Sequence, residues 1–304
     1  MNLLSEKWHQ PIRCFQNVSE YNAIEGPDFC WNIRYESETY PLTTAAPIYF
    51  ILDSSNHAAF SHWVYENATW LPYFLEIQQR YPSCRLVLKQ MKTYKQLYAD
   101  FYGVSRDCMV VAPPLEKENF CFFHSYTSLN DKAIPDIYHK NLLHYQKRLE
   151  ILFEQKEKKI PLLYLPRGSK ENFLGANNRT YDIQTDLKQH VLNMGGTVYE
   201  TDTTTDLHTQ IQLIQNAKII LLDYGSNLWV NGFFARNSKI ICLNIGWNQH
   251  SQYPSLEILW KAIQETNTIS QVFAYTSNEK NIEGISLVKI HISHVLQSIS
   301  EALS

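Results

Sequence analysis

The segment from Leu162 to Asn244 constrains the fold most, because apolar runs of strand length alternate in it with helical patterns. LLYLPR (Leu162 to Arg167) and IILLD (Ile219 to Asp223) have the length and composition of buried strands. A turn containing Gly225 follows the second run and leads into a further helix. Strands that alternate with helices in this way predict an α/β fold with a mostly parallel sheet.

The first half of the chain repeats the alternation. IYFILD (Ile48 to Asp53) predicts a buried strand. From Ala58 a helical pattern follows, in which Pro72 should kink the helix or split it in two. Shorter strands and helices continue the pattern, whereas the first forty or so residues show no strong periodicity and predict an irregular lead-in.

A charged run, EQKEKK, closes a helix predicted from Ile134 to Lys156 and marks a natural domain junction. The sequence thus predicts two α/β domains, 1–156 and 157–304, which matches the length of the chain. His291 to Leu303 has an apolar face and predicts a packed amphipathic helix. The pattern leaves open whether that helix packs on its own domain or back toward the first.

Composition narrows the function classes. A net charge of −3 argues against nonspecific nucleic-acid binding. The amino terminus lacks a long apolar core, so neither a signal peptide nor a membrane anchor is expected, and the six cysteines without a C-x-x-C pair suit reduced thiols in the cytoplasm. No H-E-x-x-H, Walker loop, G-x-S-x-G or G-x-G-x-x-G occurs, which disfavours metalloprotease, NTPase, hydrolase and dinucleotide functions and predicts no metal site.

Candidate ligand-binding residues gather where strands of the second domain end. Arg167 closes the first strand and Arg179 follows in the next loop, and two guanidinium groups there suit a diphosphate. The turn Tyr224-Gly225-Ser226-Asn227 adds a helix start, and Asn231 shares a face with Asn227. The alternatives are surface arginines in salt bridges and an ordinary strand-to-helix turn.

Candidate acid–base residues lie in the first domain. His62 and Glu66 are four residues apart on the predicted helix, so Glu66 could orient the imidazole of His62 for proton abstraction from an acceptor hydroxyl. Asp53, at the end of the first buried strand, is the reserve candidate. The alternative for His62 and Glu66 is a solvated helical ion pair.

At these residues the chain resembles glycosyltransferase family 61, which contains xylosyl- and N-acetylglucosaminyltransferases. SHWVYENATWLPYF is similar to the family's H-W-x-x-E-x-L-P segment, and LYLPR followed by NNR is similar to its strand-arginine-loop-arginine segment. The segment TDLHTQIQLIQNAKIILLDYGSNLWVNGFF matches its helix glutamine, alanine, glycine turn and asparagine at Gln210, Ala217, Gly225 and Asn231.

The resemblance implies a GT-B architecture, with two Rossmann-like domains facing across a cleft. It implies inverting, metal-independent transfer from a UDP-sugar to a glycan or other hydroxyl acceptor, with no cofactor beyond the donor. Tyr224 replaces a usual histidine, and Asp182 is the nearest match to a usual acidic residue. Two alternatives remain, namely a noncatalytic nucleotide-sugar or glycan-binding module and an unrelated doubly wound enzyme.

Overall fold

A computed structural model describes much of the chain. The described residues are 12–18, 20–24, 30–34, 37–38, 48–52, 63–88, 90–111, 118–123, 133–153, 157–166, 179–200, 206–225, 227–244, 254–274, 276–280 and 286–304. At some of these positions, Glu66 and Arg179 among them, the backbone alone is described. The chain divides into two compact units, Met1–Tyr145 (unit 1) and Gln146–Ser304 (unit 2).

The sheet of unit 1 has the strand order β4-β1-β8-β5-β6-β7. Its parallel part joins β5 (Ile48–Ile51), β6 (Arg85–Leu88), β7 (Met109–Val111) and β8 (Glu118–Phe123). The predicted strands of the first domain are therefore present. Phe50, in the centre of this part, is fully buried against Phe74, with the ring centroids 5.8 Å apart.

The irregular lead-in predicted for the first forty residues is wrong. β1 (Ile12–Val18) and β4 (Ser37–Glu38) extend the sheet in antiparallel pairing, and β2 (Glu20–Ile24) pairs with β3 (Cys30–Arg34) in a separate ribbon. β1 finds its partner in β8, about a hundred residues away along the chain. Pairing of such distant segments stabilises a strand without leaving a clean local alternation.

The helical segment that contains Pro72 is split, as the sequence predicts. A π-helical turn, η2 (Trp63–Asn67), and a 3₁₀ turn, η3 (Ala68–Trp70), precede α2 (Leu71–Arg80). Pro72 lies in the first turn of α2, where its missing N–H group has no intrahelical acceptor to satisfy. The proline therefore starts a new helix instead of bending an old one.

The remaining helices of unit 1 follow the predicted order. α3 (Thr93–Phe101) leads through the short turn η4 (Arg106–Cys108) into β7, and α4 (Ala133–Leu152) closes the unit. The division between the units falls inside α4, before the junction that the charged run predicts after Lys156. The end of α4, from Gln146 on, belongs to unit 2, where Gln146 Nε2 donates to Phe233 O and Glu150 pairs with Arg236.

The main sheet of unit 2 is parallel, with the order β11-β9-β12-β13-β14. Its strands are β9 (Ile160–Leu165), β11 (Thr197–Val198), β12 (Ala217–Asp223), β13 (Lys239–Asn244) and β14 (Thr268–Phe273). The central strands are buried almost throughout, as expected for strands covered on both faces. The α/β fold with a parallel sheet is thus confirmed.

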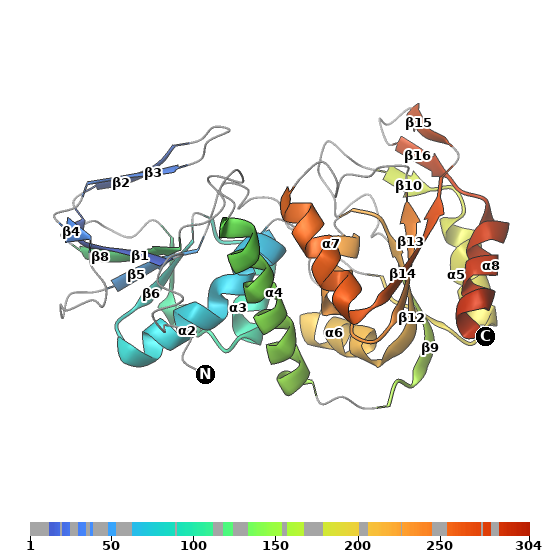
Figure 1. Cartoon of the computed structure of the whole chain (residues 1–304), viewed down its shortest axis with the longest axis horizontal. Coiled ribbons are helices and arrows are strands. Elements are labelled where there is room, and N and C mark those ends of the chain that lie inside the picture. Colours follow the sequence, from blue (N-terminus) through green and yellow to red (C-terminus); the bar gives the residue numbers. More distant parts are fainter. Residues whose placement is uncertain are drawn as a thin grey trace. The chain divides into compact units, whose positions relative to one another are not determined.

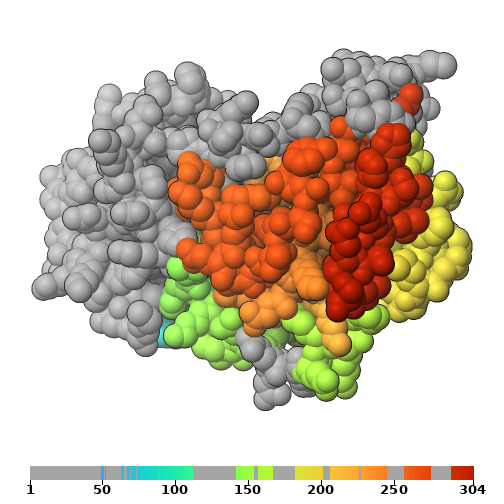
Figure 2. Space-filling view, turned by 45° about the vertical axis from the view of Figure 1, so that its right-hand side comes forward, coloured from blue at the N-terminus to red at the C-terminus, as the bar shows by residue number. Residues whose placement is uncertain are grey.

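Helices cover both faces of this sheet (Figure 1). α5 (Gln184–Asn193) and α8 (Ile292–Leu303) lie on one face, where Leu187, Val191, Val295 and Ile299 join one buried cluster with the strands. α6 (Leu207–Asn216) and α7 (Pro254–Thr266) lie on the other face. α8 therefore packs on the sheet of its own unit, and Figure 2 shows its outer side at the surface.

A small sheet adjoins this core, with β10 (Arg179–Tyr181) parallel to β16 (Ser286–Lys289) and β16 antiparallel to β15 (Thr276–Lys280). Asp182, next to β10, accepts a hydrogen bond from the backbone N of Ile290 at 3.3 Å. The carboxylate thereby joins this sheet to the start of α8. Across the described residues, no helix is long and apolar enough to cross a membrane.

Candidate functional site

The carboxyl edge of the unit 2 sheet contains a topological switch point between β9 and β12. The chain leaves β9 for β11 on one side and then enters β12 on the other. The β9–β12 pairing ends at Leu165 with Leu222, whereas β12 and β13 stay paired through Asp223 and Leu243. Pro166, which follows β9, has no N–H group to continue the pairing. In open α/β sheets, ligands bind in the crevice at such a point.

A tight turn leaves β12 beside this point. Tyr224 is buried, and its backbone N donates to Leu243 O at 2.9 Å. Gly225 has φ 111°, a backbone conformation that side chains disfavour, and its O accepts from the backbone N of Trp229 at 3.0 Å. The glycine that the sequence singles out is thus required by the backbone itself.

The helix after the turn begins with a π-helical segment, η6 (Leu228–Gly232). π-Helical turns are rare and often occur at functional sites, because the wider turn changes where side chains point. Asn227 stands just before this segment and Asn231 lies within it. Their predicted proximity is confirmed, since Asn231 Nδ2 donates to Asn227 Oδ1.

Three amide side chains from two elements, α6 and the segment that starts η6, meet here. Gln210, on α6, donates from Nε2 to Asn231 Oδ1. Asn227 in turn donates from Nδ2 to Leu165 O at 2.6 Å. We call Gln210, Asn231 and Asn227 the amide series. It connects a crossover helix to the carboxyl end of β9, across the switch point.

Aromatic side chains support the same turn. The rings of Tyr224 and Trp229 meet edge to face with centroids 5.5 Å apart, and Trp229 meets Trp260 of α7 at 6.1 Å. Tyr224 and Trp229 are 1% and 4% exposed. Tyr224, which the sequence places among the donor-binding residues, thus packs its ring inside unit 2.

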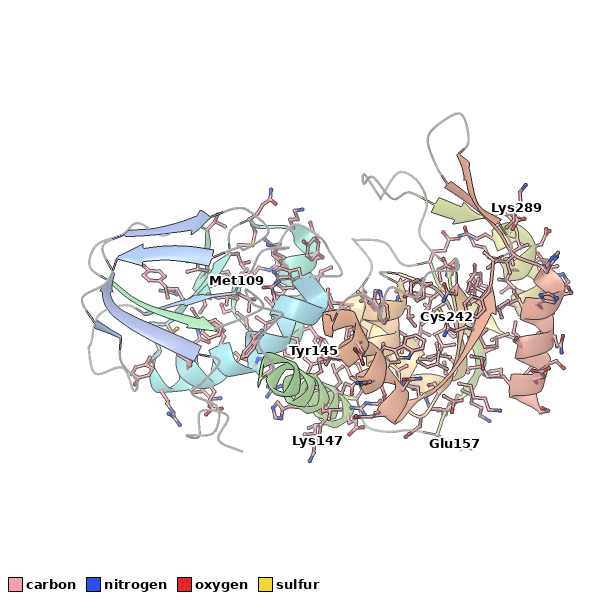
Figure 3. The ribbon with its side chains drawn as sticks, turned by 45° about the horizontal axis from the view of Figure 1, so that its top comes forward. Met109, Tyr145, Lys147, Glu157, Cys242 and Lys289 are labelled. Atoms are coloured by element: carbon pink, nitrogen blue, oxygen red, sulfur yellow. The ribbon has the colours of Figure 1, made fainter. Side chains whose placement is uncertain are left out.

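Two buried polar residues lie at the carboxyl ends of β12 and β13, and sequence reasoning missed Asn244 and the burial of Asp223. Asp223 is 1% exposed and Asn244 is fully buried, and Asn244 Nδ2 donates to Gln271 Oε1 at 2.5 Å. Burial, together with the charge of Asp223, raises the pKa of the Cys242 thiol. Figure 3 shows Cys242 within the packed side chains of unit 2. The available signal was a polar residue that closes each apolar run, as in IILLD and CLN.

The predicted arginine pair is placed only in part. Arg167 lies outside the described residues, as does Ser226. Arg179 begins β10, where it pairs with Ser286 of β16, so it stands in a strand and not in the predicted loop. The convergence of both guanidinium groups on one diphosphate remains a prediction.

The predicted acid–base residues of unit 1 are placed less fully. Asp53 and His62 lie outside the described residues, and Glu66 belongs to η2. The predicted α-helix is wrong over this segment, because a π-helical turn spaces its hydrogen bonds five residues apart. Glu66 therefore does not lie in an α-helix, and its pairing with His62 stays a hypothesis.

The environment of Trp63, beside these residues, contains a buried cation that the sequence did not reveal. Lys95 is fully buried on α3, with Nζ 5.7 Å from the centroid of the Trp63 ring. The rings of Tyr94 and Tyr98 meet Trp63 edge to face. Cation–π attraction and these edge contacts fix the start of η2.

Metal binding is not supported by side chains that the structure describes, among which no three His, Cys, Asp or Glu side chains gather. Asp53 and His62 fall outside that search, so metal independence stays a prediction. No protein-family model matches the chain, and no curated protein matches its sequence.

Proposed function

We propose that the protein is an inverting, metal-independent glycosyltransferase of glycan biosynthesis. It would move a hexosyl or pentosyl group from a UDP-sugar to a glycan or another hydroxyl acceptor. The motifs shared with glycosyltransferase family 61 support the reaction class. The geometry at the carboxyl edge of the unit 2 sheet supports the location of the donor.

The observation that carries the proposal is the bridged switch point. Gly225, which has a positive φ, follows β12 at the switch point, and the side chain of Asn227 bonds to Leu165 O at the end of β9. Glycine allows close approach of a phosphate or a base to the main chain. Polar backbone in a fixed turn at a switch point suits a nucleotide better than an apolar ligand.

In this proposal each predicted residue has one role. Arg167 and Arg179 neutralise the diphosphate and stabilise UDP as the leaving group. Gly225, Ser226 and Asn227 form the nucleotide pocket, and Gln210, Tyr224 and Asn231 shape it.

His62 acts as the base in the same proposal. It removes the acceptor hydroxyl proton while the oxygen attacks the anomeric carbon from the face opposite UDP, which inverts that centre. Glu66 orients His62, and Asp53 is the reserve base. The GT-B arrangement of two Rossmann-like domains facing across a cleft belongs to the proposal as well.

Calorimetry with UDP tests the donor site. The wild-type chain should bind UDP, Arg179→Ala should weaken binding by about a hundredfold, as loss of a charged phosphate contact predicts, and His62→Ala should bind as the wild type does. Arg106→Ala is the matched control, because Arg106 forms an exposed ion pair with Asp100 at 2.7 Å in unit 1. Equal binding by all variants would remove the donor assignment.

A panel of UDP- and GDP-sugars with mixed acceptors tests turnover. UDP release that His62→Ala abolishes, with an inverted anomeric centre in the product, is the expected result. UDP binding without release of UDP would instead identify a noncatalytic nucleotide-sugar or glycan-binding module. An unrelated doubly wound enzyme would bind no UDP at all.

A further inference from the structure

We infer that Gln210 and Asn231 are positioning residues. They hold the turn after β12, which contains Tyr224 and Gly225, in place through the amide series, and they do not contact the ligand. This inference rests on the proposed function, because the turn it concerns is the proposed nucleotide site. Gln210 is 6% exposed and Asn231 is 3% exposed. The side-chain hydrogen bonds of both amides run to other side chains of the series.

The amide series has a direction, and Leu165 O fixes it. A backbone carbonyl accepts hydrogen bonds and cannot donate, so Asn227 must present Nδ2 to it. Oδ1 of Asn227 then faces Asn231, which must donate from Nδ2. Asn231 is left with Oδ1 toward Gln210, which must donate from Nε2. Turning over any one amide would bring two oxygens or two NH₂ groups together.

The series therefore reaches from α6 to the turn without any gap. Gln210 does not bond to Asn227, yet it fixes the orientation of the amide that does. Buried hydrogen bonds in series strengthen one another and leave few alternative arrangements. A substitution at Gln210 should therefore change the orientation of the Asn227 amide.

An amide of similar burial at the other end of the same sheet provides the contrast. Asn267 is 9% exposed and bonds mainly to backbone atoms, accepting from Ser238 N and donating to Ala235 O and Ile263 O, besides the hydroxyl of its neighbour Thr266. These bonds join the end of α7 to the residues before β13, and none of them involves the amide series. Asn267→Leu is thus a matched control for loss of a buried amide without loss of the series.

Two UDP-binding measurements test the inference. Gln210→Met keeps the side-chain length but removes the donor, and it should weaken UDP binding about tenfold. In an Asn227→Ala background the same change should weaken binding no further, because the series already lacks its last link. Asn267→Leu should lower the melting temperature and leave UDP affinity unchanged.

A ligand-free measurement separates this inference from the proposed function. Hydrogen exchange at the amides of Tyr224 and Trp229, which are bonded to Leu243 O and Gly225 O, should quicken in Gln210→Met and not in Asn267→Leu. Unchanged exchange, or losses of UDP affinity that add in the double variant, overturns the positioning role. Quickened exchange in a chain that binds no UDP keeps the positioning role and removes the proposed function.

Discussion

The two ends of the unit 2 sheet handle their buried polar groups differently. At the amino end, Lys158 Nζ donates to Gln215 O, Ala217 O and Ser238 Oγ at 2.8–3.2 Å. Ser238 Oγ donates in turn to Ala217 O, and Asn267 bonds to backbone around it. At the carboxyl end, the amide series bonds side chain to side chain and reaches backbone at Leu165 O.

The polar side chains at the amino end stabilise the fold, whereas those at the carboxyl end also orient the turn after β12. Side chains that bond to backbone at the amino end satisfy backbone hydrogen-bonding groups at the carboxyl end of α6 and at the starts of strands. Buried backbone groups require such partners. Side chains that bond to one another at the carboxyl end set the orientation of a turn. We therefore expect substitutions at the amino end to change the free energy of unfolding, and substitutions at the carboxyl end to change UDP affinity as well.

The largest expected effect on stability follows from Asn267→Leu. The substitution leaves Ser238 N, Ala235 O and Ile263 O without this partner, and it should lower the free energy of unfolding by about 3 kcal/mol. Urea denaturation measures the change. Asn216→Ala is the control, because the exposed Asn216 side chain bonds within its own helix to Gln212 O. A loss no greater than that of the control would contradict the assignment.

Gly225→Ala is expected to act on both stability and binding. The φ of 111° at Gly225 is disfavoured for alanine, so the variant should lose about 2 kcal/mol of stability and most of its UDP affinity. Gly195→Ala is the matched control at the amino end, since Gly195 has φ 73° and open space for a Cβ atom. Calorimetry of both variants should show loss of UDP binding at Gly225 alone. Equal binding would erase the contrast between the two ends.

Asp206→Ala should have a smaller effect. Asp206 caps α6 by accepting from the backbone N of His208 and Thr209, and loss of a cap costs about 1 kcal/mol. The hydrogen bond from the Thr209 side chain and the capping bonds lower the pKa of Asp206. The stabilisation is therefore complete above the ordinary carboxyl pKa and disappears as pH falls through the lowered one. Urea denaturation of the wild type and of Asp206→Ala measures this. Their free energies of unfolding should differ at neutral pH and become equal in acid.

At neutral pH Lys158→Met is expected to give the smallest effect, and its signature is a pH dependence of the free energy of unfolding. Burial lowers the pKa of Lys158 from 10.5 to about 8. Between these values the unfolded chain holds a proton that the folded chain has released, so the wild type gains stability as pH rises through that window. The variant lacks this gain, so the difference in free energy of unfolding between the wild type and the variant should grow as pH rises. Parallel pH curves for the two chains would show that Lys158 titrates normally.

The sequence predicts the unit 2 sheet well because its strands are apolar on both faces. IILLD and its neighbours need no knowledge of their partners to be identified as buried strands. β1 was missed for the opposite reason, since its residues become a strand by pairing with distant β8. Local pattern therefore reports burial more faithfully than it reports pairing.

The candidate site divides in the same way. Gly225 and the contact between Asn227 and Asn231 follow from short-range rules, namely positive φ and spacing within one helical turn. The bond from Gln210 to Asn231 joins residues 21 positions apart on different elements, so no spacing rule predicts it. The π-helical turns were also hidden, because apolar periodicity alone does not distinguish them from an α-helix.

The position of Gln210 on α6, outside the turn after β12, has an evolutionary consequence. A substitution on a crossover helix can alter ligand preference while each residue that touches the ligand stays the same. Related chains could then diverge in substrate with identical pockets. Comparison of pocket residues alone would group such chains together, whereas inclusion of the α6 glutamine would separate them.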